Sequence, residues 1–141
     1  MKKEPITDKD LCLRLPLITK YFEMTKAGIK TEDYREITPY WCNRLALLNG
    51  KKLKKENWRG YLLYSGKLYM KLCSNPKMPV NSVEFQKFEE NTMTLGYPKS
   101  TDTERILNYE HKGIEIRTGN PEWGAVKGKL YFVIMHGRLL S

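Results

Sequence analysis

The stretch AGIKTEDYREITPYW, residues 27–41, combines the end of one helix, a charged strand and the start of another helix. Gly28 suits the left-handed position that follows many helices. Thr38 and Pro39 are typical of a helix start, as N-cap and first helical residue. Charges lie on both faces of the strand expected over residues 31–37. They either lie on a solvated edge strand, their usual place, or line a polar cleft, and the residues alone leave both interpretations open.

Composition limits the classes of protein to which the chain can belong. Its 141 residues fit one domain, and its net charge of +9 indicates a polyanionic partner, either nucleic acid or an anionic membrane surface. No apolar run reaches the ~20 residues that cross a bilayer, and no apolar segment follows the first lysines as in a secretion signal. Three widely spaced cysteines predict neither a disulfide framework nor a zinc site. We therefore expect a cytoplasmic protein without metal or cofactor.

A dense basic cluster lies within residues 51–59 and encloses Trp58. Basic residues interleaved with an aromatic ring suit a phosphate backbone and a stacked base. A solubilising loop would have the same composition, and both interpretations stay open.

Hydrophobic periodicity and turn residues predict the secondary structure along the chain. The expected elements are a strand over 11–17, a helix over 20–27 capped by Thr19, a strand over 31–37, a helix from Thr38 to about Leu48, a helix near 55–65, and strands over 85–95, 105–117 (broken at Gly113) and 130–135. Residues 1–10 are polar, and we expect them to be frayed. Helices followed by many short strands predict an α+β domain with a small closed or half-closed barrel.

Two motifs resemble a known family. A Lys-Thr-x-x-x-Arg pattern after a helix-ending glycine, here Gly28, Lys30, Thr31 and Arg35, resembles the signature of the ASCH domain. Further segments resemble its bacterial and phage branch: Tyr34-Arg35-Glu36, Pro39-Tyr40-Trp41, Leu95-Gly96-Tyr97, Asn120-Pro121-Glu122-Trp123-Gly124-Ala125, Lys127-Gly128 and Tyr131-Phe132-Val133-Ile134. The resemblance covers about residues 11–48 and 88–140. It implies a single domain over 11–141 with an insertion at about 51–85.

The resemblance implies a PUA-like fold, a small, mostly antiparallel β-barrel with helices covering a cleft that binds RNA or a nucleotide. Some members are reported hydrolases of N4-acetylcytidine, with catalysis assigned to a Lys, a Thr and a Glu, and some are ribonucleases. The Lys matches Lys30, but the Thr falls on Asp33, and a carboxylate cannot replace a hydroxyl nucleophile without changing the mechanism. Glu89 and Glu90 are candidates for the mid-chain Glu. The candidate catalytic residues are therefore Lys30 and Asp33.

The same cleft would hold cations that bind phosphate and aromatic rings that stack on a base. The candidate ligand-binding residues are Lys30, Thr31, Arg35, Glu36, Tyr40, Trp41 and Trp123. Packing is the alternative for Trp123, and pairing with a neighbouring cation is the alternative for Asp33. If Arg35 ties the strand to a buried partner, its removal costs roughly 3–5 kcal/mol. Removing Lys30 from a cleft wall would cost almost no stability.

Three hypotheses for function follow. The first is a binding module for RNA or a nucleotide. The second is a hydrolase that acts on RNA or a modified nucleoside. The third is a phage or mobile-element protein that binds a host protein through residues 51–72.

Overall fold

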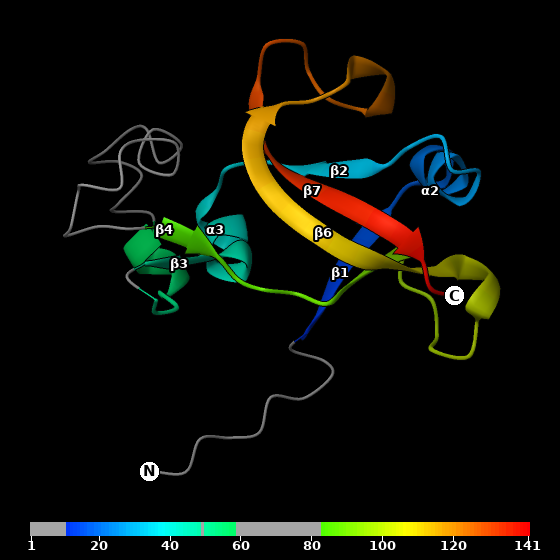
Figure 1. Cartoon of the computed structure of the whole chain (residues 1–141), viewed down its shortest axis with the longest axis horizontal. Helices are drawn as coiled ribbons and strands as arrows, with labels where there is room; N and C mark the ends of the chain where they lie inside the picture. Colours follow the sequence, from blue (N-terminus) through cyan, green and yellow to red (C-terminus); the bar gives the residue numbers. More distant parts are fainter. Residues whose placement is uncertain (1–10, 49, 59–82) are drawn as a thin grey trace.

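The computed structural model describes residues 11–48, 50–58 and 83–141, which form an α+β fold (Figure 1). The residues expected to fray and most of the expected insertion lie outside the described residues. In chain order the elements are β1 (Cys12–Leu17), α2 (Thr19–Lys26), β2 (Glu32–Arg35), α3 (Pro39–Leu45), β3 (Ala46–Leu48), β4 (Val83–Phe85), β5 (Glu90–Leu95), the 3-10 turn η1 (Thr103–Arg105), β6 (Ile106–Thr118), the 3-10 turn η2 (Pro121–Trp123) and β7 (Leu130–Leu139).

A five-stranded sheet in the order β1-β5-β6-β7-β2 curls into a half-barrel. Only the β1–β5 pair is parallel among the pairs of this sheet. The long strand β6 bends across the molecule (Figure 1), and its register with β7 shifts on either side of His111. Gly113 lies at the second shift with a φ of 140°, a conformation that L side chains rarely adopt. The strand break predicted at this glycine is therefore a bulge within one continuous strand.

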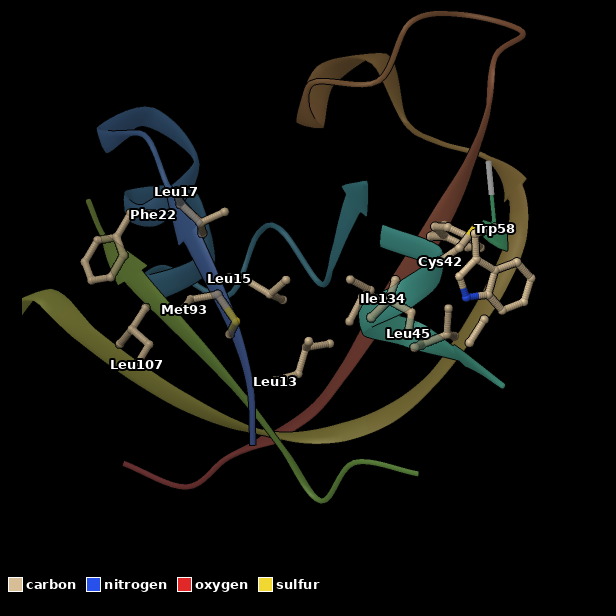
Figure 2. Close-up of a cluster of buried hydrophobic side chains, with 13 residues drawn as sticks. Leu13, Leu15, Leu17, Phe22, Cys42, Leu45, Trp58, Met93, Leu107 and Ile134 are labelled. Atoms are coloured by element: carbon tan, nitrogen blue, oxygen red, sulfur yellow. The ribbon is translucent and has the colours of Figure 1, made fainter. Parts of the chain in front are cut away.

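The core fills the concave side of the half-barrel (Figure 2). Alternate residues of β1 point into it, as the sequence pattern predicts. The buried apolar side chains include Leu13, Leu15, Leu17, Phe22, Leu45, Met93, Phe132 and Ile134. Trp58 also belongs to this core and is 0% exposed. The interpretation of Trp58 as a stacking residue within the basic cluster is therefore wrong, because its ring is not accessible to a base.

The two N-terminal helices have the predicted ends, with two exceptions. Ile18 rather than Thr19 is the N-cap residue of α2, and the helix ends before Gly28, whose φ is 76°. The Thr38 side chain accepts a hydrogen bond from the Trp41 N–H at the start of α3. This helix ends at Leu45 instead of residue 48, because the next three residues become extended and pair with β4.

Two further expectations are corrected in the second half of the chain. The strand expected over 85–95 is two strands, β4 and β5, which belong to different sheets. The last strand continues beyond its apolar part to Leu139. Residues 55–58 are helical as predicted, and the other positions of the expected helix lie outside the described residues. In the part of the chain that is described, no helix is both long and apolar enough to span a bilayer.

Arg35 connects the two edges of the curled sheet. Its Nη2 donates to the Pro16 carbonyl of β1 at 3.1 Å, and its Nη1 donates to the Tyr34 carbonyl of β2 at 3.3 Å. Because β1 and β2 are the first and last strands of the sheet, this side chain spans the opening of the half-barrel. The guanidinium also lies 5.2 Å from the centre of the Trp41 ring. We call this contact between β1 and β2 the seam.

Replacement of Arg35 by alanine should lower the melting temperature. The hydrogen-bond partners of Arg35 are neutral carbonyls, which the substitution leaves without a donor. We therefore expect the free energy of unfolding to fall by about 1–3 kcal/mol, which is less than the loss when a buried charge is left without its partner. Chemical denaturation followed by circular dichroism measures this cost. Arg44→Ala is the matched control, since Arg44 also lies over Trp41 but belongs to α3 rather than to a sheet edge. Equal melting temperatures for the two variants would show that the seam adds no stability.

Candidate functional site

Asp33 lies on β2 with its carboxylate inside the half-barrel and is 2% exposed. One oxygen, Oδ1, accepts a hydrogen bond from Lys30 Nζ, and the other, Oδ2, lies 2.6 Å from His136 Nε2. Pairing of β2 with β7 brings these groups together, because His136 N donates to the Thr31 carbonyl at the end of the ladder. Both carboxylate oxygens therefore have a partner.

Lys30 is 3% exposed and also points inward. Besides Asp33, its ammonium donates to the Glu32 carbonyl at 2.6 Å. The rings of Tyr21 and Tyr34 lie 5.7 and 5.8 Å from Nζ. Burial lowers the pKa of Lys30, and the charge of Asp33 opposes this shift. The ammonium is thus held by two oxygens and two aromatic faces and does not lie at the surface.

The Asn91 side chain fixes the direction of the hydrogen bonds beyond Asp33. Its Nδ2 donates to the Met135 carbonyl at 3.1 Å and lies 2.7 Å from His136 Nδ1. A flipped amide would place Oδ1 against that carbonyl, so Nδ2 must face His136, whose Nδ1 then accepts. The proton of a neutral His136 ring lies on Nε2 and is donated to Asp33. On its other side, Asn91 Oδ1 accepts from His111 Nδ1 at 2.7 Å.

The pKa shifts agree with a buried ion pair. Burial alone would raise the pKa of Asp33, but the hydrogen bond from His136 and the charge of Lys30 lower it to about 2. Asp33 is therefore ionised at neutral pH. We call the connected side chains the polar chain: Lys30, Asp33, His136, Asn91 and His111. Such a network is rigid when every member is satisfied.

Three members of the polar chain, His136, Asn91 and His111, are not predicted from the sequence. His136 lies 103 positions after Asp33, and no local spacing links the two. The available signal was a polar residue at an inward position of a buried strand. Asn91 and His136 both lie on strands whose neighbouring residues are largely buried.

The loop between β6 and β7 covers the tyrosine rings around the ammonium group. A Cβ added at Gly119 would lie 2.6 Å from the Tyr34 ring, and one at Gly124 would lie 2.9 Å from the Tyr21 ring. Only glycine permits such a close approach at either position. Trp123 lies in this loop and is half-buried.

The remaining candidates do not join the polar chain. Thr31 and Glu36 are exposed, and Glu36 pairs with Lys129 at 2.6 Å. Glu89 and Glu90 line a separate hollow near the beginning of β1. No mid-chain glutamate is therefore seen beside Asp33 among the described residues.

A second group of candidates gathers around Trp41 on α3. The guanidinium carbons of Arg35 and Arg44 lie 5.2 and 5.9 Å from the ring centre. Tyr40 packs perpendicular to the same ring, with centroids 5.1 Å apart, and is 49% exposed. We call these residues the α3 surface: Arg35, Tyr40, Trp41 and Arg44. Lys30 and Asp33 of the sequence-predicted residues thus belong to the buried polar chain, whereas Arg35, Tyr40 and Trp41 gather at α3, where Tyr40 is exposed and the other two are partly buried.

Burial of Lys30 changes the stability expected for its removal. Lys30→Ala leaves Asp33 with one partner in the protein interior, and breaking a buried pair in this way costs about 3–5 kcal/mol. We therefore expect a clear fall in melting temperature. Lys129→Ala, which breaks the exposed pair with Glu36, is the control and should melt close to the wild type. If the Lys30→Ala protein were as stable as the control, Lys30 would not be part of a buried pair, and the position on a cleft wall would be supported instead.

Acid should destabilise the fold through His111. Burial, with the neighbouring His136 as a smaller cause, lowers the pKa of His111 from 6.5 to about 4. The unfolded chain then binds a proton before the folded one, so stability falls as the pH drops from about 6.5 towards 4. His111→Asn keeps a donor for Asn91 but does not titrate. The free energy of unfolding, measured by denaturation at each pH, should therefore decrease less between about pH 6.5 and 4 for this variant than for the wild type. If the free energy of unfolding depended on pH equally in the two proteins, His111 would not be the cause of the acid sensitivity.

Comparisons with known proteins give no match. No family model, no curated protein and no solved structure is found to be similar to this chain. Among the described residues no group of three or more histidines, cysteines and carboxylates is arranged to hold a metal ion. The polar chain and the α3 surface are therefore the features that bear on function.

Proposed function

We propose that the protein binds single-stranded RNA on the α3 surface. The observation that carries this proposal is the packing of two guanidinium groups and a tyrosine around Trp41. Proteins recognise single-stranded nucleic acids through two components: cationic side chains along the phosphate backbone and aromatic rings on which the bases stack. The resemblance to ASCH domains supports the same class of ligand.

Exposed lysines in the segment that follows β3 support the same ligand. Asn43 on α3 donates from Nδ2 to the Leu53 carbonyl at 2.7 Å, so the segment after β3 lies along the helix. Every lysine of this segment is exposed, namely Lys51, Lys52, Lys54 and Lys55. These side chains could contact the phosphates of an RNA strand whose bases stack on the aromatic residues. The net charge of +9 also favours RNA as the partner.

Hydrolysis is a second candidate, favoured by the connected ionisable groups of the polar chain. Perturbed ionisable groups cluster at catalytic sites, although structural ion pairs have the same signature. Lys30 and Asp33 are 3% and 2% exposed, so a substrate would reach them only after the loop between β6 and β7 moved away. Incubation with N4-acetylcytidine and with single-stranded RNA tests this candidate. An unchanged substrate in both cases would leave binding as the function.

RNA binding should depend on salt and on Arg44. Affinity for a fluorescein-labelled oligouridylate, measured by anisotropy, should fall steeply between about 50 and 200 mM salt, because phosphate contacts release counterions. Arg44→Ala should weaken binding and reduce the salt slope by about 1.

Arg138→Ala is the matched control for this measurement. Arg138 is also an arginine with an exposed side chain, but it lies near the end of β7 beside Glu110, away from α3 (Figure 1). It should bind as the wild type does. An affinity that is flat with salt, or equal losses in the two variants, would contradict the proposed surface.

A further inference from the structure

Tyr97 is the most exposed of the large hydrophobic side chains that the structure describes, with 92% of its surface accessible. It follows β5, on a turn that includes Gly96 and Pro98. No part of the core requires a tyrosine at such a position. An aromatic ring presented to solvent on a defined turn is a feature of recognition surfaces.

The turn that carries Tyr97 is anchored. Gly96 has a φ of 66°, and its N–H donates to the Leu17 carbonyl at 3.2 Å. The Thr94 hydroxyl donates to the Gly96 carbonyl at 2.8 Å. Pro98 restricts the residue before it to extended conformations. The ring is therefore attached to a backbone that is fixed on the preceding side by two hydrogen bonds.

This turn lies beside the seam. Strand β1 pairs in parallel with β5, so that Pro16 is opposite Thr94 and Leu17 is opposite Leu95. The carbonyl of Pro16 accepts the hydrogen bond from Arg35. Tyr97 thus follows β5 at the end where the guanidinium group meets β1.

Two tyrosines belong to elements that adjoin Arg35: Tyr40 packs on the Trp41 ring under the guanidinium group, and Tyr97 follows the strand paired with β1. Burial lowers the pKa of Arg35, whereas Asp33, Tyr40 and Tyr97 act in the opposite direction. Tyr40 approaches from α3 and Tyr97 from the turn after β5. Both rings are exposed, and they belong to two different elements that adjoin the seam.

We propose that Tyr97 is a further stacking residue of the RNA site and receives an unpaired base next to the base that stacks at Tyr40. This inference rests on the proposed function. A strand bound in this way would cross the seam, with a phosphate near Arg35 between two stacked bases. Single strands suit such a surface because each base has an aromatic face and the linking phosphate carries the charge that complements the arginine.

Anisotropy with the labelled oligouridylate tests this role of Tyr97. Tyr97→Ala should weaken binding at least about fivefold, since stacking of one base on an aromatic side chain is worth about 1–3 kcal/mol. Tyr97→Phe should stay within about twofold of the wild type, because the ring remains. The salt slope should not change in either variant, since no phosphate contact is removed. Val126→Ala removes a side chain that is 61% exposed on the β6–β7 loop and is the control.

An abasic strand of the same length separates stacking from other effects. The loss caused by Tyr97→Ala should disappear on this ligand, whereas the loss caused by Arg44→Ala should persist. Melting temperatures equal to that of the wild type should accompany both tyrosine variants, because the ring is outside the core.

The outcomes distinguish this inference from the function on which it rests. If Arg44→Ala weakens binding but Tyr97→Ala does not, the α3 surface stands and the role of Tyr97 is refuted. Equal losses for Tyr97→Phe and Tyr97→Ala, or a loss that persists on the abasic strand, also refute stacking. If the wild-type protein binds no single strand, both proposals fail.

Discussion

One buried carboxylate determines the arrangement around β2. Asp33 lies within the half-barrel, where an unpaired charge is not tolerated, and it therefore requires both Lys30 and His136. His136 can donate to it only while Asn91 faces the Met135 carbonyl with its amide nitrogen. The Met135 carbonyl thus orients the Asn91 amide, which contacts His136 on one side and His111 on the other. This requirement explains why a strand with an inward-facing charge can belong to a packed sheet.

A buried ion pair is weak evidence for stability, because desolvation offsets much of the attraction between the charges. The pair around Asp33 instead constrains its surroundings. The ammonium of Lys30 lies against the Tyr21 and Tyr34 rings, and the β6–β7 loop packs on both rings. Glycines in the β6–β7 loop allow the backbone to lie directly on both rings. The glycines of this loop therefore permit both the turns of the loop and its packing over the polar chain.

The parts of the fold that depend on local patterns could be predicted from the sequence. The alternating leucines of β1 and the Thr38–Pro39 start of α3 are examples, since each is set by residues within a few positions. The end of α3 could not be predicted, because the partner that draws the next residues into a strand lies about forty positions away. The candidate site divides in the same way. Residues in the motif were found, whereas His136 and Asn91 join them only through strand pairing.

Arg35 belongs both to the seam and to the α3 surface, so the proposed binding surface includes a residue that also connects the sheet edges. The guanidinium is positioned by the Pro16 carbonyl and Trp41 only when β1 and β2 have closed. The proposed surface therefore exists in the folded chain and not in the unfolded one, so that any ligand of this surface stabilises the fold by mass action. A polyanion would also screen the repulsion among the positive charges of the chain. The stability of the fold and the proposed binding of RNA would consequently depend on the same contact between β1 and β2.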